Sequence, residues 1–122
     1  MPKVLVAEDD RFLSKAYGAK LKKEGFDVIL AMNGEEAVEE AKNKKPDIIL
    51  LDLVMPRKDG FEALSDLKKD ASTKSIPVII LSNLGQEEDI IKGKELGAVD
   101  YLVKSNIAIR EVVEKIREVL KK

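Results

Sequence analysis

Five short apolar runs recur along the chain, and the stretches between them carry apolar residues at helical spacing. The runs cover residues 4–7, 28–31, 48–51, 78–81 and 101–103. Runs that do not alternate polar with apolar residues are typical of strands buried on both faces. A strand followed by a helix, repeated five times, predicts an α/β fold with a doubly wound parallel sheet of five strands.

Helical periodicity predicts helices over residues 11–24, 61–71, 86–96 and 107–121, and a shorter helix that follows Asn33. Asn33, with Glu36 three residues later, is a capping signal, and Gly25 and Gly97 are suited to end the helices before them. Gly93 interrupts the helix over residues 86–96, which we expect to be the weakest and most mobile of the five. The whole chain, residues 1–122, is expected to form one domain.

The order of the strands predicts where a ligand would bind. Right-handed crossovers place helices on both faces of such a sheet, and the order expected for five strands is 2-1-3-4-5. In this order the switch point lies between the first and third strands. Ligands of open parallel sheets bind at the carboxyl ends of the strands beside that point, so the residues that follow these strands are the first candidates for chemistry.

Composition excludes several kinds of chemistry. The chain has no histidine and no cysteine, which excludes imidazole and thiol catalysis and thiolate metal sites. Its 22 basic residues nearly balance 23 acidic ones, so we expect no direct nucleic-acid partner. We also expect no membrane partner and a cytoplasmic location, because the sequence shows neither a long apolar stretch nor a signal-peptide pattern.

Carboxylates gather at the predicted switch point. Glu8, Asp9 and Asp10 follow the first strand, and Asp52 follows the third. Like charges held together need a cation, and Mg2+ prefers oxygen ligands of this kind. Each acid also has an ordinary interpretation, in which the first three favour the start of a helix, with Asp10 as its cap, and Asp52 starts a turn.

Two further strand ends add a hydroxyl and an ammonium to the same edge. Ser82 follows the fourth apolar run and Lys104 follows the fifth. A phosphoryl group on Asp52 would need its oxygens met by such groups, because phosphoryl transfer depends on positioning and charge neutralisation. Taken singly, Ser82 could start a turn and Lys104 could extend into solvent. Together these residues predict a phosphoacceptor site.

Over essentially its whole length the chain resembles the receiver domain of two-component response regulators, and it is close in size to the single-domain chemotaxis type. The resemblance implies a flavodoxin-like (βα)5 fold. No single motif is specific, but their order along the chain is. The residues that carry the resemblance are Asp9, Asp10, Asp52 in Leu-Asp-Leu-Val-Met-Pro, Asp59-Gly60, Ser82, and Tyr101 three places before Lys104.

The resemblance implies a donor and a metal for Asp52. The donor is a phosphorylated histidine of a sensor kinase or phosphotransfer protein, and this chain, without histidine, is the recipient. The implied cofactor is Mg2+, held by Asp9 or Asp10, by Asp52 and by the backbone carbonyl of Val54. The only implied reactions are self-phosphorylation and self-dephosphorylation at Asp52, so we expect no enzyme that turns over other substrates.

The resemblance also implies how the signal leaves the site. Lys104 and Ser82 contact the phosphoryl oxygens, Ser82 moves toward them, and Tyr101 turns inward behind it. These movements alter the face made by the fourth helix, fifth strand and fifth helix, which binds a downstream protein. We expect a monomer before phosphorylation.

Several residues depart from the family pattern. Ser105 follows Lys104 where proline, often after a cis bond, is usual, which leaves the isomer of this bond open. Asn83 replaces the usual alanine or glycine, and it either narrows access to the site or adds a hydrogen bond. Val54 and Leu84 are apolar at positions that flank the phosphoryl group, from which we expect slow self-dephosphorylation.

Other functions fit the sequence less well. A flavodoxin-like cofactor binder needs a phosphate-binding loop after the first strand, where three acids would repel phosphate. A phosphatase with an aspartyl nucleophile resembles an Asp-x-Asp pattern, but Val54 stands at the second position. A receiver-like interaction module without phosphorylation, or a phosphorelay intermediate without its own output, is the remaining alternative.

Overall fold

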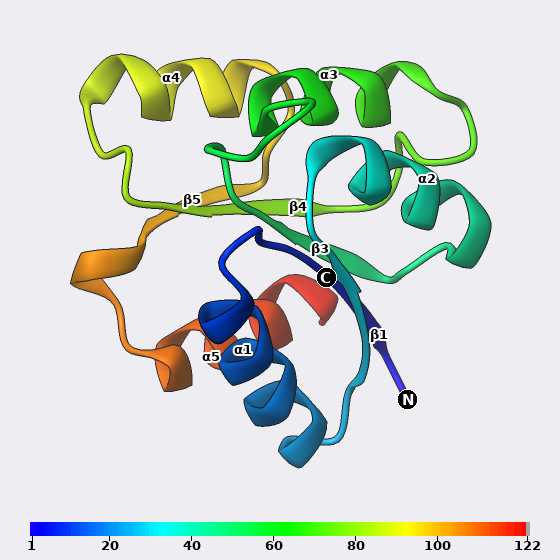
Figure 1. Ribbon diagram of the computed structural model, residues 1–122, viewed down its shortest axis with the longest axis vertical. Coiled ribbons are helices and arrows are strands. Elements are labelled where there is room, and N and C mark those ends of the chain that lie inside the picture. The colour runs from blue at the N-terminus through cyan, green and yellow to red at the C-terminus, as the bar shows by residue number, and fades with distance from the viewer. Residues whose placement is uncertain (122) are drawn as a thin grey trace.

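The computed structural model describes residues 1–121 and contains five parallel strands in the order β2-β1-β3-β4-β5 (Figure 1). The strands are β1 (Lys3–Ala7), β2 (Asp27–Ala31), β3 (Ile48–Leu51), β4 (Val78–Ser82) and β5 (Asp100–Val103). The parallel pairing and the order confirm the predicted sheet, and each strand contains the apolar run that predicted it. Lys122, the last residue of the expected domain, lies outside the described residues.

Helices cover both faces of the sheet. Among the described residues these are α1 (Arg11–Lys23), α2 (Gly34–Lys44), α3 (Gly60–Lys69), α4 (Glu87–Glu95) and α5 (Ile109–Leu120). Figure 1 shows α2, α3 and α4 on one face and α1 and α5 on the other, and each face has its own buried apolar cluster. All four residues of β3 are buried, as expected for a strand between two helical layers. Within residues 1–121, no helix combines the length and apolarity needed to cross a bilayer.

The helix ends differ from the sequence predictions by one or two residues, because local hydrogen bonds determine them. α3 ends at Lys69, two residues early, since Asp70 is extended and its Oδ1 accepts hydrogen bonds from the backbone N–H and the hydroxyl of Ser72. α5 begins two residues late, since a 3-10 helix, η1 (Lys104–Asn106), and an extended Ile107 come first.

α4 approaches the sheet closely through its glycine. Gly93 is buried, and a Cβ at this position would lie 3.2 Å from Cδ2 of Tyr101 and 2.5 Å from Cδ1 of Ile80. Gln86, the N-cap of α4, provides no side-chain cap hydrogen bond to residues 1–121, unlike the N-caps of α1, α2 and α3. The glycine is therefore explained by close packing, and the expected mobility of α4 stays a prediction.

The capping signal at Asn33 is confirmed and gives a test of the fold. Its Oδ1 accepts the backbone N–H of Glu36 at 2.9 Å, and Oε1 of Glu36 accepts that of Met32 at 2.8 Å. We expect Asn33→Ala to lower the free energy of unfolding by about 0.5–2 kcal/mol in urea denaturation, because a helix N–H loses its acceptor. Asn33→Ser keeps an acceptor and should retain most of this free energy. Equal losses in both variants would contradict the capping interpretation.

Candidate functional site

Strand geometry brings three charged side chains to one place. Side chains alternate between the two faces of a sheet, so residues two apart share a face. The residues of β1, β3 and β5 that pack in the cluster with α1 and α5 are Val4, Val6, Ile48, Leu50 and Leu102. Two residues beyond the last of these on each strand, the same face carries Glu8, Asp52 and Lys104. The alternation that buries the core therefore also directs the two acids and the lysine toward each other.

The ammonium of Lys104 joins two carboxylates. Its Nζ donates to Oε1 of Glu8 and to Oδ2 of Asp52, the latter at 3.0 Å. Glu8 is 3% exposed and Asp52 is 7% exposed, so this pairing lies mostly away from water. Oδ1 of Asp52 accepts the backbone N–H of Leu53 at 2.7 Å. One Asp52 oxygen is thus held by the backbone and the other by the lysine.

The charges within this group are not balanced. Burial would lower the pKa of Lys104, but the hydrogen bond with Glu8 and the charge of Asp52 outweigh it and raise this pKa. Lys104 therefore stays cationic at neutral pH. Burial, reinforced by the charge of Asp52, raises the pKa of Glu8 even though Lys104 and the N–H of Asp10 lower it. One ammonium is not enough to offset the cost of burying Glu8 beside Asp52.

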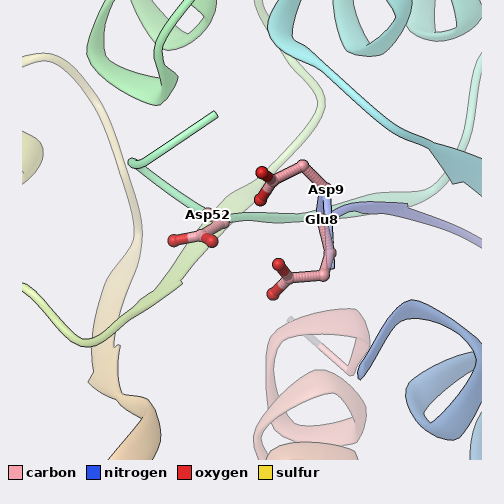
Figure 2. Close-up of side chains that lie close together, drawn as sticks. All are labelled: Glu8, Asp9 and Asp52. Carbon is pink, nitrogen blue, oxygen red and sulfur yellow. The ribbon is translucent and has the colours of Figure 1, made fainter. Parts of the chain in front are cut away.

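Asp9 adds a third carboxylate to the group. Figure 2 shows Glu8 and Asp9 on opposite sides of the end of β1, with Asp52 beside them. One oxygen from each of the three carboxylates lies within 4.8 Å of the others. Three acids against one lysine leave negative charge, and oxygen ligands at this spacing suit a hard divalent cation such as Mg2+. The residues present therefore fit a magnesium site.

Asp10 was expected both as an alternative to Asp9 in the metal site and as a helix cap, and the structure shows it in the cap position. It is the N-cap of α1, and its Oδ1 accepts the N–H of Leu13 at 3.1 Å. Glu8, which the sequence analysis placed among the acids after the first strand but not among the metal ligands, lies in the acidic cluster with Asp9 and Asp52. The signal for it is the strand register: Ala7 pairs with Leu51, so the next residues along the two strands are Glu8 and Asp52.

A cavity of about 330 Å³ opens beside Asp52. Ser82, which ends β4 and is fully buried, lies in its wall, and its Oγ accepts the N–H of Leu84 at 3.3 Å. Val54 and Leu84 also line this cavity and are 59% and 37% exposed. The structure therefore brings the hydroxyl, the ammonium and both expected apolar residues around Asp52. The described residues contain no cis peptide bond, so Lys104 and Ser105 are joined by a trans bond.

Tyr101 lies on the other face of the sheet, in the core with α4. Its side chain is buried, and its hydroxyl donates to the backbone carbonyl of Leu84 in the loop after β4. The ring is therefore already turned inward in this structure. The expected movement of Ser82 and Tyr101 stays a prediction.

Gly60 allows α3 to begin against the backbone of the site. Its N–H donates to the carbonyl of Leu53 at 2.9 Å. A Cβ at this position would overlap the carbonyl oxygen of Asp52 and lie 2.6 Å from Cα of Leu53. Asp59 caps the helix, because its Oδ1 accepts the N–H of Glu62 at 2.9 Å. The Asp59-Gly60 pair thus ties the start of α3 to the segment that carries Asp52.

The fold is that of the response regulator receiver domain. The family model of the response regulator receiver domain matches residues 4–117, which include all the charged residues of the site. The chain belongs to the response regulator receiver domain family.

Individual relatives agree with this assignment. The chain is 43% identical over 104 residues to Protein PilH of Pseudomonas aeruginosa, covering 85% of this chain and 86% of PilH. The structure of the Francisella response regulator 1452 receiver domain is similar, with a TM-score of 0.91, 36% identity and coverage of 99% of this chain and 98% of that one.

A chain in the CheX-CheY-BeF3-Mg2+ complex of Borrelia burgdorferi has a TM-score of 0.90 and 33% identity, with coverage of 99% and 90%. Several transcriptional regulators also match, and the chain spans 46–50% of their length.

The close approach at Gly60 predicts a stability difference between two glycines. We expect Gly60→Ala to lower the free energy of unfolding by about 1–3 kcal/mol, because the added methyl group meets backbone that cannot move aside. Gly18→Ala is the matched control, since its Cβ would lie 3.5 Å from Cδ2 of Leu30, an ordinary contact. In the interior of α1 that change should be neutral or stabilise by up to about 1 kcal/mol. Thermal or urea unfolding of both variants measures the difference, and a neutral Gly60→Ala would contradict it.

Proposed function

We propose that Asp52 accepts a phosphoryl group from a phosphorylated histidine of a sensor kinase or phosphotransfer protein, and that the protein signals through the resulting change in shape. The observation that carries the proposal is the environment of Asp52. This carboxylate directly follows the central strand, contacts an ammonium at 3.0 Å and borders an open cavity whose wall also contains Asp9 and Ser82. Membership of the receiver family supports the same function.

The residues around Asp52 suit the transfer step. An oxygen of Asp52 attacks phosphorus, the bond from phosphorus to the donor histidine nitrogen breaks, and its electron pair stays on that nitrogen. Lys104 neutralises charge on the phosphoryl oxygens, and the hydroxyl of Ser82 donates a hydrogen bond to one of them. Asp9, Asp52, the carbonyl of Val54 and, in place of Asp10, Glu8 would hold Mg2+, which would supply further positive charge to these oxygens.

The signal is proposed to leave through α4, β5 and α5. Tyr101 connects the site to this face, because its hydroxyl is bonded to the carbonyl of Leu84, two residues after Ser82. A movement of Ser82 toward a phosphoryl group would displace this loop and with it the tyrosine and α4. A downstream protein is proposed to bind the altered face, as the resemblance implies.

Other parts of the function remain predictions. The protein is proposed not to turn over substrates other than its own phosphoryl group, and not to bind nucleic acid directly. A cytoplasmic location and a monomer before phosphorylation are proposed from the sequence. The Borrelia complex contains CheX and CheY with BeF3 and Mg2+, which supports Mg2+ as the cofactor here.

Intact mass after incubation with acetyl phosphate and Mg2+ tests the proposal. We expect one added phosphoryl group on the native chain and none on Asp52→Asn, because the amide lacks the nucleophilic oxygen. A chelator should prevent the addition, because the acidic cluster then keeps its repulsion toward phosphate. No addition with acetyl phosphate or with a range of sensor kinases would favour the interaction module without phosphorylation.

The apolar residues at the cavity predict the lifetime of the phosphorylated form. Val54 and Leu84 provide no group that orients a water molecule for attack on the phosphoryl group. We expect Val54→Asn with Leu84→Glu to shorten the lifetime about tenfold, equal to about 1.4 kcal/mol of barrier. The loss of the added mass after removal of acetyl phosphate measures it. Val54→Leu with Leu84→Met is the apolar control, and an unchanged lifetime in the polar variant would contradict the hypothesis.

A further inference from the structure

The side chain of Asn83 connects the chain segments that follow β4 and β5. The backbone N–H of Ser105 donates to Oδ1 of Asn83 at 3.1 Å, across 22 residues of sequence. Asn83 directly follows Ser82, and Ser105 directly follows Lys104. The bond thus joins the residues next to both proposed phosphoryl contacts.

The contact of Lys104 with Asp52 depends on the position of the backbone that follows β5. β4 lies between β5 and β3, so the strand ends before Lys104 and Asp52 are two strand spacings, about 10 Å, apart, and the two side chains together bridge this gap. The β4–β5 pairing ends at Ser82 and Val103, and the chain then enters the three-residue helix η1, a type with weak internal hydrogen bonds. A small shift of η1 would therefore move the ammonium of Lys104 relative to Asp52.

The two ends of the bond, Asn83 and Ser105, are two of the departures from the family pattern found in the sequence. Proline at position 105 would have no N–H to donate, and alanine or glycine at position 83 would have no side-chain acceptor. Asn83 with proline at position 105 would have no N–H to accept, and Ser105 without Asn83 would have no side-chain acceptor for its N–H. Together they form one hydrogen bond between exposed residues.

We propose that Asn83 is a positioning residue for phosphorylation: by accepting the N–H of Ser105, it fixes the backbone that carries Lys104 and so the contact of Lys104 with Asp52. The inference rests on the proposed function of Asp52. A displacement of about 1 Å at a reacting group can cost about a hundredfold in rate, so one bond at this place has a measurable effect. A single exposed hydrogen bond contributes little to global stability, so the effect falls on the rate.

The test compares phosphorylation rates from acetyl phosphate and Mg2+ by intact mass. We expect Asn83→Ala and Asn83→Leu to react about tenfold more slowly than the native chain, which is about 1.4 kcal/mol of barrier. Alanine leaves the cavity more open and leucine keeps it filled. Equal losses of rate in the two variants would therefore exclude an effect on the access of acetyl phosphate to Asp52. Asn83→Asp keeps the acceptor and should retain a rate closer to native, and Ser105→Ala keeps the backbone N–H and should be unchanged.

A double-mutant cycle separates positioning from other roles. If Asn83 acts through Lys104, then Asn83→Leu has no further effect when Lys104→Ala is already present. A double variant whose rate loss is the product of the two single losses would overturn the proposal, and so would a native rate in Asn83→Leu. Either result would leave the proposed function intact. The native chain is measured first, and a native chain that takes no phosphoryl group overturns the proposed function and this inference with it.

An amide readout tests the bond in the unphosphorylated protein. We expect the backbone N–H of Ser105 to exchange with solvent at least about tenfold faster in Asn83→Leu than in the native chain and in Asn83→Asp, because it loses its acceptor. Urea unfolding midpoints should stay nearly the same in all Asn83 variants. Unchanged exchange in Asn83→Leu would show that the bond does not hold the loop, and would overturn the inference.

Discussion

The parallel pairing of β1 with β3 is the constraint on which the site depends. It places Glu8 next to Asp52, because each follows a paired residue at the end of its strand. The apolar residues beneath them fix the direction of both side chains, since a shift by one residue would turn the acids to the other face and expose the core. Core packing and site chemistry are therefore set by the same register.

This arrangement carries an electrostatic cost that the protein offsets only in part. Buried carboxylates repel each other and lose hydration, and the ammonium of Lys104 is shared between two of them. Burial, with the charge of Asp52, raises the pKa of Glu8 despite Lys104, as expected where one ammonium serves two buried carboxylates. A site with unbalanced negative charge attracts a divalent cation, and a cation there in turn makes the site receptive to an anionic phosphoryl group.

The sequence was sufficient for the sheet and for most of the site. Unbroken apolar runs identify buried strands. Residues at the carboxyl ends of parallel strands meet at one edge of the sheet, independently of the conformation of the loops. The sequence was not sufficient to separate Asp10 from Glu8, because neighbouring acids look alike until the register decides which faces β3 and which caps α1. Nor could it pair Asn83 with Ser105, since that bond depends on the path of two loops.

The alternation of side chains also divides the work between the two helical layers. Asp52 and Lys104 face the layer of α1 and α5, whereas Tyr101 packs with α4 on the opposite side. Substitutions on the exposed surface of α4 do not touch the contact between ammonium and carboxylate. Under the proposed function, an evolving lineage can therefore exchange one binding partner for another on that side while the chemistry at Asp52 stays the same.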